Sequence, residues 1–186
     1  NESGASIYST SQTAREEFPE LDATVRGTIS IGRRLQDPLS ELVKIDPQHI
    51  GVGMYQHDVS EKRLKESLED VVESCVNYVG VDLNTASASL LRHVSGFNQL
   101  VARRVVEWRS KHGRFTSRTQ LHDVHGIGDA VFTQAAGFLK IADGEEPLDN
   151  TWIHPESYET ARALLRLIGF EPDQWRSAKV AIGEAL

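Results

Sequence analysis

The feature that most constrains the fold of this chain is a turn of two glycines around one apolar residue, Gly126-Ile127-Gly128. Apolar residues flank the turn with helical spacing, Leu121 and Val124 before it and Phe132 and Ala135 after it. We expect Gly126 and Gly128 to adopt backbone angles that side chains forbid, and Ile127 to anchor the turn in the core. The pattern predicts two short helices joined by a tight turn.

A second, degenerate copy of the pattern lies thirty residues earlier, at Ser95-Gly96-Phe97-Asn98. Asn98 stands in place of the second glycine. Asparagine enters the left-handed backbone region more readily than most side chains, so we expect the turn to survive, with the Asn98 side chain crowding any bound anion. The two copies resemble a paired helix-hairpin-helix signature, and they predict helices near residues 86–93, 99–111, 117–122 and 129–139.

The chemistry of such a turn suits a phosphate. Backbone N–H groups in the turn and in the first turn of the next helix lack partners within the helix, and the positive end of the helix dipole lies behind them. Donors from the backbone recognise phosphate geometry and carry no base information. The residues that we expect at these sites are Gly126, Ile127, Gly128, Asp129, Gly96, Phe97 and Asn98. The alternative is that the hairpins are helix connectors or protein contacts.

The charge distribution favours the same reading, although the net charge of -7 taken alone argues against a polyanionic ligand. The segment 92–118 is basic, with Glu107 as its one acid. Its other charged residues are Arg92, Arg103, Arg104, Arg109, Lys111, Arg114 and Arg118, which leaves a local excess of +6, from 7 basic residues minus 1 acid. We expect phosphate contacts from Arg103, Arg104, Lys111 and Arg114, unless these charges form an ordinary solvated surface.

Two aromatic residues lie among these basic residues. Trp108 and Phe115 could stack on bases, as aromatic side chains do in proteins that bind single strands. Their spacing favours packing between the two hairpins instead, and that is the role that we expect.

The rest of the chain divides at proline and glycine positions. We expect a short strand at residues 5–9, helices within 25–35, 39–44 and 60–79, a hinge at Gly51-Val52-Gly53, and an acidic connection at 143–155. A helix from Tyr158 to Ile168 would follow, and the tail from Asp173 would add a helix packed by Trp175. The predicted domains are 1–46, 47–79, 80–142 and 143–186.

Several kinds of site are not indicated. Cys75 is the one cysteine and lies on the apolar stripe of the helix at 60–79, so we expect it in the core rather than in a disulfide. His122 and His125 have a spacing that metals use, but no further ligand completes the set, so we expect no metal and no cofactor. No apolar stretch approaches the roughly 20 residues of a membrane helix, which predicts a cytoplasmic protein.

Five strings, in this order and around the paired hairpins, resemble the Tex family of RNA-binding transcription accessory proteins. They are Ala5-Ser6-Ile7-Tyr8-Ser9, Arg33-Arg34-Leu35-Gln36-Asp37-Pro38, Ile50-Gly51-Val52-Gly53-Met54-Tyr55-Gln56-His57-Asp58-Val59, Val81-Asp82-Leu83-Asn84-Thr85-Ala86-Ser87 and His154-Pro155-Glu156-Ser157-Tyr158. The resemblance implies a mainly α chain in which 1–46 is the strand-containing end of an RNase H-like domain of the resolvase type. It also suggests that the chain is an excerpt of a longer protein.

This resemblance implies a partner and a process rather than a reaction. The partner would be the phosphate backbone of RNA or DNA, and RNA polymerase or other transcription machinery would be a further partner of a monomeric protein. A resolvase-like nuclease is one alternative, but it needs carboxylates from several strands and Glu2 is the one beside a candidate strand. A protein-interaction scaffold is the other, and it predicts partner binding that is insensitive to salt.

Overall fold

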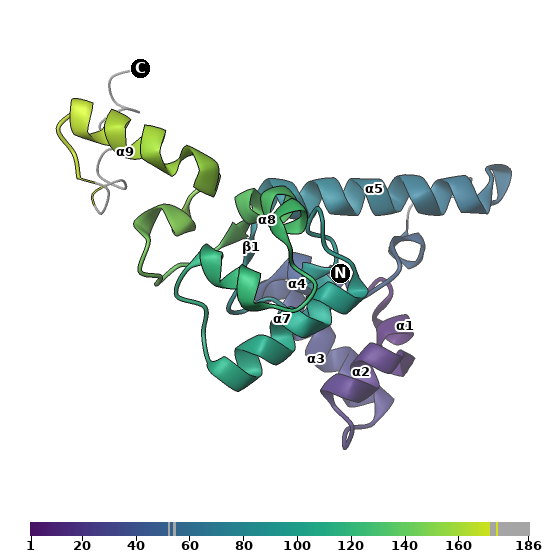
Figure 1. Cartoon of the computed structure of the whole chain (residues 1–186). Coiled ribbons are helices and arrows are strands. Elements are labelled where there is room, and N and C mark those ends of the chain that lie inside the picture. Colours follow the sequence, from purple (N-terminus) through teal and green to yellow (C-terminus); the bar gives the residue numbers. More distant parts are fainter. Residues whose placement is uncertain (52, 54, 172–173, 175–186) are drawn as a thin grey trace. The chain divides into compact units, whose positions relative to one another are not determined.

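The computed structural model describes residues 1–51, 53, 55–171 and 174, and it divides the chain into two compact units, Asn1–Val76 and Asn77–Leu186 (Figure 1). The described part is mostly helical, which confirms the predicted fold class. Trp175 and its predicted helix lie outside the described residues, as does Val52 of the predicted hinge. The domain boundaries after residues 46, 79 and 142 stay predictions.

The first unit consists of short helices followed by one long one. Its elements are α1 (Ala5–Thr10), α2 (Gln12–Glu17), α3 (Ala23–Gln36), α4 (Pro38–Leu42), η1 (Pro47–His49), η2 (Gln56–Asp58) and α5 (Glu61–Val79), which continues into the second unit. Side chains begin several of these helices. The Asp22 carboxylate accepts the Val25 N–H at the start of α3, and Pro38 at the start of α4 follows a capping aspartate.

The predicted strand at residues 5–9 is wrong, because this segment forms helix α1. Gly4, at a left-handed φ of 69°, leads into the helix, and the buried residues Ala5, Tyr8 and Ser9 have helical spacing. Tyr8 packs in a core cluster with Ala14 and Ile45. A five-residue string offers too few positions to distinguish a helix from a strand, and this packing decides the matter.

Glu2 is therefore not beside a strand. Its carbonyl accepts a hydrogen bond from the Ala5 N–H at 2.9 Å, just before α1. The strand beside which the nuclease alternative placed this carboxylate is absent from the described residues, because that segment forms α1.

A polar network supports the helices of the first unit. The buried Glu41 carboxylate lies 2.6 Å from Lys44 Nζ and accepts the Ser30 hydroxyl at 3.0 Å. The Tyr8 hydroxyl donates to Glu17 at 2.7 Å, and burial together with this carboxylate raises the pKa of Tyr8. The network satisfies polar groups that would otherwise destabilise the core.

Helix α5 confirms the long helix that the sequence predicted, but its apolar stripe is not a core. Cys75 is exposed, and so are Val71 and Val79, at 58% and 53%. The buried residues near the end of the helix are Val76 and Asn77. The prediction of a core cysteine is therefore wrong, because periodicity locates an apolar face and does not show what covers it.

The second unit contains the two hairpins and a C-terminal helix. Its elements are β1 (Val81–Asp82), α6 (Ala88–Leu91), α7 (Gln99–His112), η3 (Arg118–Asp123), α8 (Asp129–Ala135), η4 (Ala136–Phe138), β2 (Leu139–Lys140), η5 (Pro147–Asn150), η6 (Pro155–Ser157) and α9 (Tyr158–Leu167). Strands β1 and β2 pair in parallel, with Val81 opposite Leu139 and Asp82 opposite Lys140. Because Leu139 belongs to β2, the helix predicted at 129–139 ends before this residue.

Candidate nucleic-acid interface

The same hydrogen bonds build both predicted turns. The Phe97 N–H donates to the Val94 carbonyl at 2.9 Å, and thirty residues later the Ile127 N–H donates to the Val124 carbonyl at 3.0 Å. Val94, Val124 and Ile127 are buried, and Phe97 is half-buried. Phe97 and Ile127 therefore anchor the turns, and their N–H groups already have acceptors within the protein.

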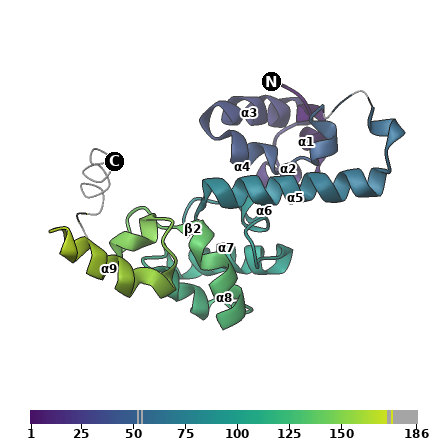
Figure 2. The same cartoon turned by 90° about the horizontal axis from the view of Figure 1, so that it is seen from above.

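Each turn packs on the second helix of the other copy, the Gly96 turn on α8 and the Gly126 turn on α7, and both helices can be followed in Figures 1 and 2. A Cβ on Gly96 would lie 2.8 Å from the Gln134 Cβ, and a Cβ on Gly126 would lie 2.7 Å from the Arg104 Nη1. Gln134 and Arg104 are themselves thirty residues apart. The two copies form one reciprocal pair.

The two glycines of the second turn differ in conformation. Gly126 has a φ of 98°, in the left-handed region, as the sequence predicted. Gly128 has a φ of -93° and a ψ of -179°, which is extended backbone open to any residue, so the prediction for this glycine is wrong. Nothing lies within 4 Å of a Cβ built on Gly128. Its value to the site is open space rather than unusual backbone geometry.

Gly128 is also the N-cap of α8, and no side chain caps this helix. The N–H groups of residues 128–131 have no acceptor within the helix. The first hydrogen bond of the helix joins the Phe132 N–H to the Gly128 carbonyl at 2.9 Å. Ala130 and Val131 thus belong to the candidate site, although the sequence pattern did not single them out. Their place directly after the glycine turn could have indicated them.

Asn98 behaves differently from the prediction. Its φ of -126° and ψ of 177° are extended, not left-handed. Its side chain caps α7, because Oδ1 accepts the Leu100 N–H at 3.0 Å and the Val101 N–H at 2.9 Å. Two first-turn donors of the first copy, the Leu100 and Val101 N–H groups, are therefore bonded within the protein.

Asp129 begins α8 with its side chain fully exposed, and its carboxylate lies 3.7 Å from His122 Nδ1. Its backbone N–H is one of the candidate donors. The negative side chain opposes a second negative charge, so the contribution of Asp129 to an anion site rests on its backbone.

Of the four predicted basic contacts, Arg104 lies at the second turn. Its guanidinium donates to the His125 carbonyl at 3.1 Å. Arg103 is exposed on the same helix. Lys111 lies seven residues beyond Arg104 in the last turn of α7, about 10 Å along the helix. Arg114 follows that end and forms an exposed ion pair with Asp143 at 3.7 Å. The structure thus brings Arg104 to the turn, and leaves Lys111 at the far end of α7 and Arg114 beyond it.

Two further arginines of the basic segment are structural. Arg109 donates to the Leu83 and Ala86 carbonyls at 2.9 and 3.1 Å. Arg118 is 0% exposed and donates to the Thr151 carbonyl at 2.6 Å. Burial lowers the pKa of both guanidinium groups. Counting every arginine therefore overstated the charge available to a ligand.

The two aromatic residues stack on each other, and their packing between the two hairpins stays a prediction. Phe115 is 1% exposed and stacks on Trp108 with the ring centroids 4.2 Å apart, and Trp108 also stacks on His112. Phe115 is thus removed from any role in base stacking.

The histidine pair of the sequence forms no ligand set in the described residues, among which no group of three or more His, Cys, Asp and Glu side chains could hold a metal ion. His122 instead contacts Phe132, with ring centroids 4.2 Å apart. No helix in the described part of the chain is long and apolar enough to cross a membrane.

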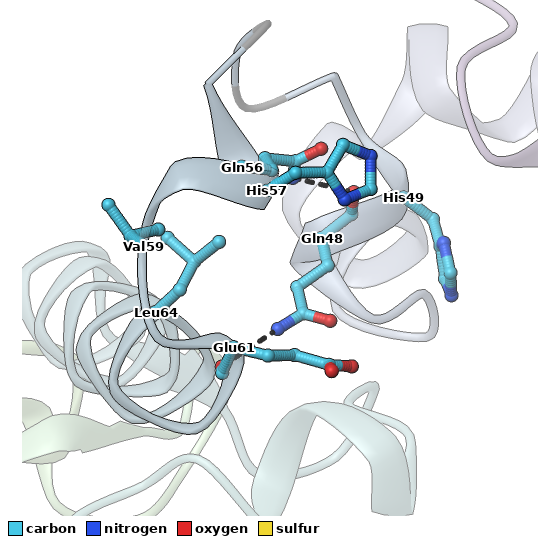
Figure 3. Close-up of a pocket in the computed structure, with 7 residues that line it drawn as sticks. All are labelled: Gln48, His49, Gln56, His57, Val59, Glu61 and Leu64. Carbon is cyan, nitrogen blue, oxygen red and sulfur yellow. Dashed lines mark hydrogen bonds between the residues drawn. The ribbon is translucent and has the colours of Figure 1, made fainter.

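The first unit has a pocket of about 440 Å³ (Figure 3). The Gln56 side-chain amide donates to the Gln48 carbonyl at 3.1 Å, and the Gln48 amide donates to the Glu61 carbonyl at 3.5 Å. The residues that line it are Gln48, His49, Gln56, His57, Val59, Glu61 and Leu64. These bonds join the 3-10 segments to the start of α5, and we assign no ligand to the pocket.

Three family models match successive parts of the chain. A Tex protein YqgF-like domain matches residues 1–36, a helix-hairpin-helix motif matches 76–140, and an HHH domain matches 146–184. The protein Tex of Bordetella pertussis is 56% identical over 168 residues, which cover 90% of this chain and 21% of that protein. The chain belongs to the Tex family.

Other relatives agree with this membership. The transcriptional accessory protein Tex of Neisseria gonorrhoeae is 57% identical over 165 residues, covering 89% of this Tex-family chain and 22% of that protein. The human S1 RNA-binding domain-containing protein 1 is 44% identical, covering 91% of the chain and 22% of the relative. The chain spans about a quarter or less of the length of the curated relatives that it matches. The predicted resemblance is confirmed, and the YqgF-like model that matches residues 1–36 supports the RNase H-like beginning that the resemblance implied.

Proposed function

We propose that this Tex-family chain binds RNA or DNA without sequence preference, through phosphate contacts of its second hairpin, as part of a transcription accessory protein. One observation carries the proposal: the uncapped start of α8 at Gly128 follows the left-handed Gly126 turn, and Arg104 lies against that turn. The match of this region to a helix-hairpin-helix motif supports it.

The contact would work through fixed donors. Several N–H groups of residues 128–131 would converge on one phosphate, with the helix dipole behind them and Arg104 adding a positive charge. The space around Gly128 lets the phosphate approach the backbone. Because the donors are backbone groups, affinity would depend on salt rather than on base sequence.

The rest of the predicted site belongs to the proposal in a secondary role. Gly96, Phe97 and Asn98 would shape the partner hairpin, and Arg103 would add long-range attraction. Lys111 and Arg114 would meet a strand that extends along α7.

The biological setting is proposed from the relatives. One is named a transcriptional accessory protein and another an S1 RNA-binding domain-containing protein. By analogy this chain would act as a non-catalytic, monomeric binding module in the cytoplasm, with RNA polymerase or other transcription machinery as a further partner.

The experiment is fluorescence anisotropy of labelled single-stranded RNA, single-stranded DNA and duplex DNA, across a salt series. The variant is Gly126→Asp, and circular dichroism checks its fold. The control is Gly51→Asp, because Gly51 has a similar φ of 81° and lies in the first unit with nothing near its Cβ. We expect the logarithm of affinity to fall with that of salt at roughly 0.7 to 0.9 per phosphate.

The comparison of the variants decides the proposal. Gly126→Asp should abolish binding and Gly51→Asp should retain it. A folded Gly126→Asp variant that binds as tightly as the wild type would contradict the proposal.

A protein-interaction scaffold is the second candidate, and helix α9 favours it. Leu164, Leu167 and Ile168 are 56%, 84% and 41% exposed, so α9 presents apolar side chains outside its core face. Such a surface could dock on the transcription machinery. Salt-insensitive binding of a protein partner, unaffected by Gly126→Asp, would identify this role.

A further inference from the structure

Three rings stack at the far end of α7, away from the second turn. Phe115 stacks on Trp108 with the ring centroids 4.2 Å apart, and Trp108 stacks on His112 with the centroids 4.8 Å apart. The three residues differ in exposure, because Phe115 is buried, Trp108 is half-buried and His112 is exposed. This aromatic stack therefore reaches from the core to the surface, where the ring of His112 is its exposed member.

The buried member of the aromatic stack is held by its backbone. The Phe115 N–H donates to Asn84 Oδ1 at 2.8 Å, and the Asn84 side-chain amide donates to the Phe115 carbonyl at 2.9 Å. The side chain of Phe115 is 1% exposed. One carboxamide thus fixes both polar groups of this residue, and the stack rests on a position that packing and hydrogen bonds determine together.

The exposed member is held as well. His112 Nδ1 lies 3.1 Å from the Trp108 carbonyl, and Nδ1 is the donor because a carbonyl oxygen only accepts. This bond and the contact with Trp108 fix one face of the imidazole ring. No other ring of the described residues stacks on His112. Its outer face, which points away from Trp108, is therefore free to take one more ring.

The turn after His112 leaves space beside this face. Gly113 ends α7 with a φ of 92°, in the left-handed region, and no described atom lies within 4 Å of a Cβ built on it. A flat ligand can approach His112 without meeting a side chain at this position.

The charges near the ring cancel. Lys111 and Arg114 are exposed, and Arg114 pairs with Asp143 at 3.7 Å while both side chains stay more than half exposed. Glu145 is also exposed, and its backbone N–H donates to the Thr116 carbonyl at 2.8 Å. The sum is zero, from 2 basic residues minus 2 acids. Affinity at this place must therefore come from the ring rather than from local charge.

A nucleobase is the ligand that fits a fixed, exposed ring in a chain that binds nucleic acid. Every base has a flat π face, so stacking on an aromatic side chain tolerates any sequence. Because His112 is already held, the base does not have to order its side chain on binding.

We infer that the outer face of the His112 ring binds a nucleobase, which extends the aromatic stack by one ring. This inference rests on the proposed function, and it adds a base contact to the proposed phosphate contact at the second hairpin. It also assigns stacking to a residue other than the two that the sequence offered. Phe115 is buried, and Trp108 already stacks with two rings of the protein.

The test compares ligands with and without bases on the whole 186-residue chain. One is a labelled oligothymidylate, and the other is an abasic deoxyribose-phosphate chain of equal length, which carries the phosphates alone. His112→Ala removes the ring, and His112→Phe keeps a ring at the same position. The matched control is His57→Ala, because His57 is an exposed histidine of the first unit. Fluorescence anisotropy across salt measures affinity.

We expect the wild type to bind the oligothymidylate about tenfold more tightly than the abasic chain, as one stacked base would give. His112→Ala should remove this tenfold advantage and leave the affinity for the abasic chain unchanged. Its log-log salt slope should equal that of the wild type, because no phosphate contact is lost. His112→Phe and His57→Ala should bind the oligothymidylate as the wild type does.

A second measurement needs no variant, and it tests the same claim if His112→Ala does not fold. The ring-proton resonances of His112 are followed by NMR while either ligand is added to the wild type. A stacked base shields these protons through its ring current, so we expect them to move upfield with the oligothymidylate and not with the abasic chain.

Other outcomes would overturn the inference. Equal affinity of the wild type for the two ligands would do so, as would a folded His112→Ala variant that binds the oligothymidylate like the wild type or loses affinity for both ligands equally. The proposed function would still stand if Gly126→Asp abolished binding. Absence of binding by the wild type to every nucleic acid would overturn the proposed function and the inference together.

Discussion

The Arg104 guanidinium lies against the Gly126 turn, where its Nη1 would be 2.7 Å from a Cβ on that glycine and donates to the adjacent His125 carbonyl at 3.1 Å. The contact places a positive charge at the turn of one hairpin from the helix of the other. It also means that any side chain at Gly126 would displace the arginine.

The first prediction concerns this turn and the stability of the chain. Gly126→Ala should lower the free energy of unfolding by about 1–2 kcal/mol, because alanine is strained at a φ of 98° and would meet Arg104. Gly128→Ser should change it by less than about 0.5 kcal/mol, because the backbone there is extended and a serine can cap α8. Urea unfolding measures both, and equal losses for the two variants would contradict the assignment.

The second prediction concerns Arg104 and salt. Arg104→Gln copies the residue at the equivalent position of the other hairpin. It should weaken nucleic-acid binding and lower the log-log salt slope by about 0.7–0.9, since one cation near a phosphate is lost. Anisotropy across salt measures the slope. Lys62→Gln, an equal change of charge on exposed α5, is the control, and an equal effect there would show that net charge alone is responsible.

The third prediction concerns the buried Arg118. It pairs with Asp149 at 3.8 Å and donates to the Tyr158 hydroxyl at 3.0 Å, with both partners buried. Arg118→Met should destabilise the chain by about 3–5 kcal/mol, because it leaves a buried carboxylate without its cation. Arg162→Met should cost about 1 kcal/mol or less, since Arg162 and its ion-pair partners are partly exposed. Similar losses in urea unfolding would contradict this account of Arg118.

The fourth prediction concerns pH. Burial, together with the nearby Arg92, lowers the pKa of His93 from 6.5 to about 4. Because the unfolded chain takes up this proton first, the contribution of His93 to stability is full above pH 6.5 and is lost as the pH falls toward 4.

Stability curves of two proteins test that contribution. The free energy of unfolding of the wild type should fall relative to that of His93→Gln between pH 6.5 and 4. Urea unfolding at several pH values makes the comparison, and subtraction of the variant removes the titration of the carboxylates. Parallel curves would show that His93 titrates alike in the folded and unfolded chain.

The hairpins could be predicted from sequence because glycine and apolar spacing are local signals. The turn at Gly126 and helices α7 and α8 follow from them. The same repeat of thirty residues also relates Ser87 and Ser117, whose side chains cap the first helix of each copy, and this correspondence was available in the sequence.

Other features depended on packing that sequence cannot supply. The strand expected at residues 5–9 is helix α1, because the burial of Tyr8 decided between two patterns that fit a short string equally well. Arg118 counted as surface charge until its partners, more than thirty residues away, were known. Asn98, by contrast, stands directly before the helix predicted at 99–111, where asparagine is a favoured N-cap, so its capping role was indicated by the sequence.

The most direct test of the central claim follows individual backbone amides. Amide resonances of the 15N-labelled chain would be followed by NMR while a short single-stranded RNA is added. We predict saturable shifts at Gly128, Asp129, Ala130 and Val131, with Leu100 and Val101 unchanged because Asn98 already bonds them. Saturable shifts confined to α9 or to the first unit, with residues 128–131 unmoved, would contradict the claim that the second hairpin is the phosphate site.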